Sequence, residues 1–567
     1  MGSLPNSRGL TWQEIGVEAR RRRDALIPAE HRLSSELLKS IANVTDVTNV
    51  HESTCLFTPS QLEIISSIAE TIVAKVAKSV WTALEVAEAF CLSASVAQQL
   101  TNCITQPMYA EALQQAKYLD DYLLKHGKVI GPLHGLPVSL KDNIITPPFP
   151  SCAGYVDWAL ETTENWPEAP VVTHLKSLGA IPYVKTAVPT AMMMPETRNN
   201  VYADTLNPHN RKLSSGGSSG GEGALIAMRG SPLGVGTDIG GSIRIPSAWN
   251  NLFGLRPSAG RFSHTGFRNV FEGQEAVKVV QGPISRDLSS LKLYSKALVD
   301  SEMWLSDATL LPIPWRTVNL LPNNELCFAF HKYDKVVRCH PPIERGVDIV
   351  VDALRKADVT MIDWEPKLHA QAWSILRPLF RADGGKEVTS RIEATGEPWF
   401  PYMHDYRDAA RAGNDLPTSQ TWKLQAQQTK LAQEYLDMWN ATAKATPTGR
   451  PIDAIIAPVS AWAAAAHGKC LYTGYTGVWN LLDYSTCVVP VTWADKTIDT
   501  KSKEYLDYTP VDERDRKVWE EYDPEVYHHG PVAIQIITRK LEEEKALALA
   551  EVVVRALGGT VPKTSFE

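Results

Sequence analysis

Residues 214–223 read SSGGSSGGEG, and the apolar run ALIA follows directly at residues 224–227. Five glycines and four serines in ten positions allow backbone conformations that other residues avoid. A flexible linker can have this composition, but linkers separate domains, whereas this stretch lies between apolar segments. We therefore interpret it as a structured turn that leads into a helix.

A second segment of this kind follows at residues 234–246, which read GVGTDIGGSIRIP. A short apolar strand runs into two glycines, a serine and the start of a helix, and backbone N–H groups at such a turn can converge on an anion. Ser242 is therefore a candidate nucleophile. If a carbonyl group lies above it, N–H groups from Ile239, Gly240, Gly241 or Ser242 would stabilise the oxyanion that forms on attack.

Upstream of both segments, residues 131–143 read GPLHGLPVSLKDN and contain a candidate base, Lys141. Lys141 ends an apolar strand, where burial would lower its pKa. A fall of about 3 units, or roughly 4 kcal/mol in favour of the neutral form, would let it act as a base near pH 7. Taken alone, the residue would more often be an exposed charge. A Ser–Lys arrangement needs no histidine, so we interpret the nearby His134 as structural.

Together and in this order, the three segments resemble the amidase signature family, in which a lysine and two serines replace a histidine-based triad. The resemblance covers most of the chain from about residue 60 onward. It implies that Lys141 is the catalytic lysine, Ser218 the bridging serine and Ser242 the nucleophile. It also implies a cis peptide bond between Gly217 and Ser218. The separation of 24 residues between the two serines matches the family's usual spacing.

Later segments resemble the eukaryotic branch of this family, which includes the fungal acetamidase-type general amidases and fatty acid amide hydrolase. They read DAIIAP at residues 453–458, NLLDY at 480–484 and GPVAIQ at 530–535. The resemblance also places Met192 in the lining of the substrate pocket, although a methionine in an apolar run is more often core packing. The predicted activity is hydrolysis of the C–N bond of a carboxylic acid amide, to an acid and ammonia or an amine, through an acyl-enzyme on Ser242.

Three residues beside the candidate nucleophile have supporting roles in this interpretation. Asp238 and Arg244 flank the turn and are expected to pair and hold it, and Thr237 lies next to Asp238. The alternative is that each residue makes unrelated local contacts, since structural ion pairs are common.

Other functions stay open on the residues alone. The pattern G-x-S-x-G occurs around Ser218 and again around Ser219, as in esterases of the α/β-hydrolase type, but that class leaves Lys141 and Ser242 without a role. An amidotransferase-type subunit of the same family, which passes ammonia to a charged transfer RNA, would need a partner protein. A binding protein could keep the scaffold without the chemistry.

The predicted fold class is α/β: a single large core with a mixed β-sheet covered by helices on both faces, with an N-terminal helical segment. The prediction rests on short apolar runs that alternate with helix-like stretches and end at glycine, proline or polar turns. The runs lie at residues 136–140, 181–184, 233–235, 326–330, 453–457, 487–491 and 532–537.

We divide the chain into an N-terminal helical arm, residues 1–57, and one amidase signature domain, residues 58–567. A helical pattern fills residues 58–123 at the start of that domain. The remaining parts are the catalytic core motifs at 131–261, an elaboration at about 300–450 with helices near 343–356 and 418–443, and late core strands at 453–538.

Composition limits the partners. With a net charge of −7 over 567 residues, the chain offers no broad cationic surface, which argues against nucleic acid. The basic run Arg20–Arg23 follows a capping box and is interpreted as a solvated helix face. No stretch of about 18 apolar residues predicts an integral membrane span, and the N-terminal residues lack the apolar stretch of a signal peptide. The expected location is the cytoplasm.

The eight cysteines contain no CxxC pair, which argues against a zinc site or a disulfide framework. We therefore expect no metal and no cofactor. The expected partner is a small-molecule amide substrate, and a homodimer stays open.

Overall fold

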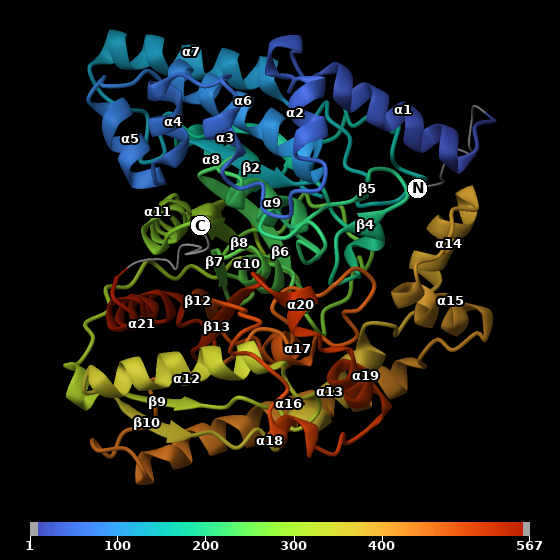
Figure 1. Ribbon diagram of the computed structural model, residues 1–567, viewed down its shortest axis with the longest axis vertical. Helices are drawn as coiled ribbons and strands as arrows, with labels where there is room; N and C mark the ends of the chain where they lie inside the picture. Colours follow the sequence, from blue (N-terminus) through green and yellow to red (C-terminus); the bar gives the residue numbers. More distant parts are fainter. Residues whose placement is uncertain (1–8, 560–567) are drawn as a thin grey trace.

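An eleven-stranded mixed β-sheet runs through the computed structural model, which describes residues 9–559 (Figure 1). The strand order is β1-β3-β2-β6-β8-β7-β12-β13-β11-β9-β10. The strands are β1 (Ile104–Pro107), β2 (Pro137–Lys141), β3 (Ile181–Thr186), β6 (Leu233–Asp238), β7 (Phe253–Arg256), β8 (Val280–Ser285), β9 (Cys327–Phe330), β10 (Thr360–Asp363), β11 (Ala454–Pro458), β12 (Thr486–Trp493) and β13 (Pro531–Ile537).

The centre of the sheet sets up the site. Strand β2 pairs in parallel with β6, with Leu140 opposite Val235, whereas β6 pairs antiparallel with β8. The carboxyl ends of parallel neighbours reach the same edge of a sheet, where α/β proteins commonly bind ligands. Lys141 at the end of β2 and Asp238 at the end of β6 therefore lie at one edge.

Apolar cores lie on both faces of the sheet. Along β11, Ile456 belongs to one core and its neighbour Ile455 to another, because successive side chains of a strand point to opposite faces. The helices that cover these faces confirm the predicted α/β class (Figure 1). Those of the larger core include α6 (Ala83–Thr101), α7 (Tyr109–His126), α11 (Leu288–Asp300), α12 (Pro341–Lys356) and α21 (Glu543–Ala556); those of the other include α13 (His369–Leu379), α16 (Thr418–Ala441) and α17 (Gly474–Leu482).

The helical pattern expected over residues 58–123 is interrupted by a strand. Helices α4 (Pro59–Ser66), α5 (Ala69–Ala77), α6 and α7 are present, but residues 104–107 form β1, which pairs antiparallel with β3. Asn102 adopts the left-handed conformation, with a φ of 55°, and so ends α6. The prediction is therefore wrong at residues 104–107, where sheet pairing outweighs the local helical pattern.

The helix expected after Thr11 is present as α1 (Trp12–Ala25), with a capping box between Thr11 and Glu14. Arg21 and Arg22 are exposed, as expected of a solvated face. Arg23 is buried instead and donates a hydrogen bond to Asn102 Oδ1 at 2.9 Å, so the prediction is wrong at this residue. Arg23 ties α1 to the end of α6.

Residues 369–411 form a helical segment that borders the candidate site described below. It contains α13, α14 (Lys386–Thr395) and α15 (His404–Arg411).

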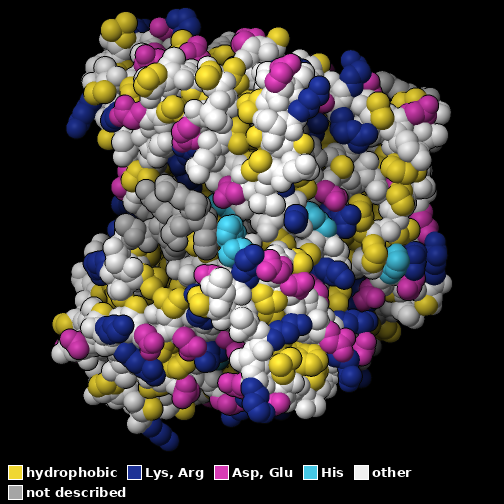
Figure 2. All heavy atoms as spheres, in the orientation of Figure 1, with side chains coloured by type: hydrophobic (Ala, Val, Ile, Leu, Met, Phe, Trp, Pro, Cys, Tyr) yellow, Lys and Arg dark blue, Asp and Glu magenta, His cyan; other side chains and the backbone are white. Residues whose placement is uncertain are grey.

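The face shown in Figure 2 carries acidic and basic side chains interspersed, without a broad cationic area. Between residues 9 and 559, no helix has both the length and the apolar composition that crossing a bilayer requires.

Candidate active site

The turn that carries Ser242 connects β6 to α10 (Arg244–Trp249). Gly241 in this turn has a φ of +130°, which other residues rarely adopt. A Cβ atom added there would also come within 2.3 Å of Thr476 Oγ1. The turn therefore requires glycine at position 241, directly before Ser242.

Lys141 points from the end of β2 into the protein interior, and its side chain is fully buried. Its Nζ donates hydrogen bonds to Ser218 Oγ at 2.7 Å and to Thr237 Oγ1 at 2.6 Å. Burial lowers the pKa of Lys141 to about 7, against the opposing effect of nearby carboxylates, chiefly Asp238. A substantial fraction of the amine is therefore neutral near pH 7.

Ser218 accepts this hydrogen bond from Lys141 and borders the same small cavity as Ser242. The peptide bond between Gly217 and Ser218 is cis, as expected. The backbone N–H of Ser219 donates to the carbonyl oxygen of Ser242 at 3.2 Å, which joins the two glycine-rich segments. The fold thus brings all three sequence motifs to one place.

Asp238 and Arg244 form an ion pair behind the turn, and neither side chain has exposed surface. Arg244 Nε and Nη2 each donate to a different oxygen of Asp238, both at 3.0 Å. Asp238 also accepts from the N–H groups of Gly241 at 2.8 Å and Ile243 at 3.1 Å. Burial alone would raise the pKa of Asp238, but Arg244 holds it well below its usual value. The carboxylate therefore stays ionised and fixes the turn.

The backbone N–H groups of the turn fall into two sets. Gly241 was expected to offer a free donor, but its N–H is engaged by Asp238. Within the part of the chain that the structure describes, the N–H groups of Ile239, Gly240 and Ser242 have no hydrogen-bond partner. Unpaired N–H groups at such a turn can hold an anionic oxygen.

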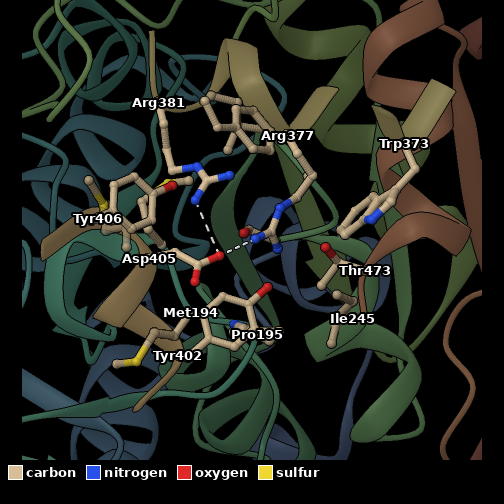
Figure 3. Close-up of a pocket in the computed structure, with 17 residues that line it drawn as sticks. Met194, Pro195, Ile245, Trp373, Arg377, Arg381, Tyr402, Asp405, Tyr406 and Thr473 are labelled. Carbon is tan, nitrogen blue, oxygen red and sulfur yellow. Dashed lines mark hydrogen bonds and ion pairs between the residues drawn. The ribbon is translucent and has the colours of Figure 1, made fainter. Parts of the chain in front are cut away.

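Two cavities meet at Ser242. The larger has a volume of about 70 Å³ and a mostly apolar lining, part of which is labelled in Figure 3. The smaller has a volume of about 20 Å³ and is bordered by Ser218 and Thr237. Met192 and Ile239 border both cavities, and contact of Met192 with the substrate stays a prediction.

The similarity of this chain to known proteins agrees with this geometry. A family model described as Amidase matches residues 85–547. The chain belongs to the amidase signature family. An acetamidase of Aspergillus oryzae is 41% identical to it over 554 residues, which cover 97% of this chain and 99% of the relative. An acetamidase of Emericella nidulans is 40% identical over 557 residues, with 97% and 99% coverage.

Solved structures have the same fold as this amidase. Fatty acid amide hydrolase superposes with a TM-score of 0.90 at 31% identity and covers 96% of this chain and 95% of its own. A bacterial aryl acylamidase of the amidase signature enzymes is similar in fold, with a TM-score of 0.67 at 19% identity and coverage of 86% and 96%. The predicted family is confirmed, and this amidase is a hydrolase that acts on amides.

Sequence reasoning missed His264 of this amidase. It borders the smaller cavity together with Ser218 and Ser242. Burial lowers the pKa of His264 to about 4, so the ring is neutral at neutral pH. Its Nε2 is buried and has no hydrogen-bond partner among the described residues. No motif surrounds His264, and it lies just beyond the predicted core region, residues 131–261.

A second group that sequence reasoning missed borders the larger cavity. Its members come from the predicted elaboration, more than a hundred residues after Ser242, and no pattern connects them to the motifs. They are Trp373, Arg377, Phe380, Arg381, Tyr402, Asp405 and Tyr406.

Two residues from the alternative interpretations have structural partners. Ser219 Oγ donates to the carbonyl oxygen of Thr237 at 3.4 Å and accepts from its N–H at 3.3 Å. His134 Nδ1 accepts from the N–H of Ile130 at 3.2 Å. Neither Ser219 nor His134 borders the two cavities at Ser242.

Proposed function

We propose that this amidase hydrolyses primary amides of short carboxylic acids to the acid and ammonia, through an acyl-enzyme on Ser242. One observation carries the proposal. The buried Nζ of Lys141, whose pKa burial lowers to about 7, lies 2.7 Å from Ser218 Oγ in the wall of a cavity that Ser242 also borders. A base and a relay are thus adjacent to the nucleophile.

In acylation, neutral Lys141 takes a proton from Ser218 while Ser218 takes one from Ser242. A neutral amine keeps two N–H donors and gains a lone pair, so it donates to Thr237 and accepts from Ser218. Ser242 Oγ then bonds to the carbonyl carbon. The negative charge that develops on the carbonyl oxygen is held by the free N–H groups of the turn, those of Ile239, Gly240 and Ser242.

Collapse of the tetrahedral intermediate breaks the C–N bond, and the amine leaves with the proton that the lysine returns through Ser218. Ser218 borders the smaller cavity but not the larger one, so the amine side of the substrate belongs in the smaller cavity. Its 20 Å³ holds one or two water-sized molecules at about 10–15 Å³ each. Ammonia fits this space, which favours primary amides.

The acyl group then occupies the larger cavity. By the same measure, 70 Å³ holds roughly five water-sized groups, which suits a short acyl chain. Met192, Ile239 and Ile245 offer apolar surface near the carbonyl. After ammonia leaves, a water molecule activated by the same relay hydrolyses the acyl-enzyme. The acetamidases among the relatives support this assignment.

The test measures ammonia release from formamide, acetamide, propanamide, butanamide, hexanamide and benzamide, and aniline release from acetanilide. We expect the highest kcat/KM with acyl groups of two to four carbons, and a value for acetanilide at least about tenfold lower than for acetamide, because the anilide overfills the smaller cavity. A fluorophosphonate should label Ser242. A label on any other residue, or full turnover by Ser242→Ala with loss in Ser219→Ala, would overturn the proposal.

A further inference from the structure

The larger cavity contains a charged group that the hydrolysis of a neutral amide does not use. Arg377, Arg381 and Asp405 are the charged residues among those that line it, and the rest of the lining is apolar or uncharged. Figure 3 shows both guanidinium groups turned toward the Asp405 carboxylate. A ligand pocket typically combines apolar walls with a few polar groups that orient the ligand.

The helical segment places these side chains together. Trp373, Arg377 and Arg381 are spaced four residues apart along α13 and the turn after it, so they lie on one side of the helix axis. The Arg377 guanidinium carbon lies 5.4 Å from the centroid of the Trp373 ring, and this cation–π contact helps to orient the side chain. Asp405 comes from α15.

Charge at this end of the cavity is not balanced. Two arginines share one carboxylate, and both contact the same oxygen, Asp405 Oδ2, with Arg381 Nη1 at 3.2 Å. Each guanidinium has five N–H donors, so most of the donors of Arg377 and Arg381 remain available for a second anion. The net charge of the three groups is +1.

The exposure of these side chains favours exchange of the anion. Asp405 is 53% exposed, whereas Arg377 and Arg381 are 32% and 27% exposed. The aspartate can therefore be solvated by water when another carboxylate approaches, while the arginines stay against the cavity wall. Planar guanidinium groups bind carboxylates through paired N–H···O contacts.

We propose that Arg377 and Arg381 bind a carboxylate at the far end of the acyl chain, so that this amidase accepts monoamides of short dicarboxylic acids. The inference rests on the proposed function, because it places the acyl group in the cavity that the arginines border. The amide carbon of such a substrate lies at Ser242, and its carboxylate competes with Asp405.

The alternative is that Asp405 and the two arginines only hold α13 against α15. This alternative predicts that substitutions there affect every substrate equally. A carboxylate site predicts instead that they change the ratio between anionic and neutral substrates of the same length, so the experiment measures that ratio.

The experiment compares malonamate, succinamate, glutaramate and adipamate with the neutral diamides of the same chain lengths. For the wild type we expect at least one chain length at which kcat/KM for the monoamide exceeds that for the diamide. Added salt should reduce this preference, because screening weakens a partly exposed charge contact. A wild type that prefers the neutral diamide at every length would overturn the inference.

Three variants test the residues. Arg377→Met and Arg381→Met should each lower the ratio of kcat/KM for the preferred monoamide to that for its diamide by about tenfold, the value of a hydrogen bond between charged groups. Asp405→Asn should raise the same ratio, because it removes the competing carboxylate. If all three variants lower both substrates in parallel, the cluster is structural and the inference fails.

Arg411→Met is the matched control. Arg411 lies on α15 like Asp405, pairs with Glu393 and does not border the cavity, so this variant should keep the wild-type ratio. Fluorophosphonate labelling of Ser242 shows which variants fold. If one of the two arginine variants does not fold, the other still tests the carboxylate site. Hydrolysis of acetamide by the wild type reports on the proposed function separately. A wild type that does not hydrolyse acetamide would reject that function, whereas acetamide turnover without a preference for anionic amides would reject only the carboxylate site.

Discussion

Arg244 and Asp238 meet through two N–H···O contacts of 3.0 Å, and neither side chain is exposed to water. Asp238 also accepts from the side-chain amide of Asn480 at 2.8 Å and from the N–H groups of Gly241 and Ile243, on either side of Ser242. The ion pair therefore acts on the position of Ser242. Removing one partner of a buried pair typically costs about 3–5 kcal/mol, because the other charge is left without compensation.

Arg244→Lys should lower kcat for acetamide by about tenfold with a smaller change in KM, because one ammonium group cannot replace a forked contact. Arg244→Ala should lower kcat further and reduce the melting temperature. Steady-state kinetics and a thermal scan check both effects. Unchanged kinetics in a folded Arg244→Ala variant would show that the pair does not position the turn.

Activity should depend on the protonation of Lys141. Because burial lowers the pKa of Lys141 to about 7, kcat/KM for acetamide should rise through about pH 7 and level off at alkaline pH. Lys141→Ala should remove most amide hydrolysis and affect ester hydrolysis less, since an ester's leaving group depends less on protonation. The pH profiles of both proteins with an amide and an ester test this. A wild-type profile and rate on amides in Lys141→Ala would make Lys141 a structural charge.

Burial of Lys141 should also lower the stability of the folded protein at neutral pH. The pKa of Lys141 is lower in the folded state than in the unfolded state, so folding releases a proton between about pH 7 and the usual value of 10.5. Wild-type stability should therefore rise with pH across that window. Lys141→Met lacks this proton release, so it should be more stable than the wild type at pH 6, and its advantage should shrink by roughly 3 kcal/mol by pH 9.

Denaturation at pH 6, 7.5 and 9 measures this stability difference. Lys117→Met is the control, because Lys117 is exposed and pairs with Asp121 on the surface. That variant should follow the wild-type pH dependence. A constant difference between Lys141→Met and the wild type at all three pH values would contradict a lowered lysine pKa.

Gly241 and its neighbour Gly240 should respond differently to an added methyl group. Gly241→Ala forces a residue with a Cβ to a φ of +130° and brings that atom within 2.3 Å of Thr476 Oγ1, so the melting temperature should fall by several degrees. A Cβ at Gly240 meets ring atoms of Phe380 at 3.7 Å, an ordinary contact, and Gly240→Ala should melt close to the wild type. Equal melting temperatures for the two variants would disprove the steric argument.

The sequence predicted those strands whose apolar runs are continuous, such as β3, β12 and β13, and it predicted which residues of the three motifs would meet. Strands β7 (FGLR) and β8 (VQGPIS) were not predicted, because glycine and proline interrupt their apolar runs and their pairing partners are distant in sequence. Such strands form because they pair within the sheet, and a local sequence pattern does not reveal this pairing.

The same limit applies to the site. Lys141, Ser218 and Ser242 stand out because glycine-rich turns and an apolar strand surround them. His264 and Arg377 border the cavities only because of tertiary packing. The residues next to them in sequence form no motif that would indicate a site. The hydrogen bond from the Gly241 N–H to Asp238 could not be predicted from the sequence either, because it depends on the conformation of the turn.

Lys141 ends the central strand β2 and Ser242 lies in the turn after the central strand β6, whereas one wall of the larger cavity belongs to the helical segment of residues 369–411. These two parts of the enzyme can diverge separately during evolution. An exchange of this helical segment between relatives should transfer the preference for the acid half of the substrate and leave the pH dependence of the reaction with the recipient. New substrate ranges could thus arise in this family without passing through inactive intermediates.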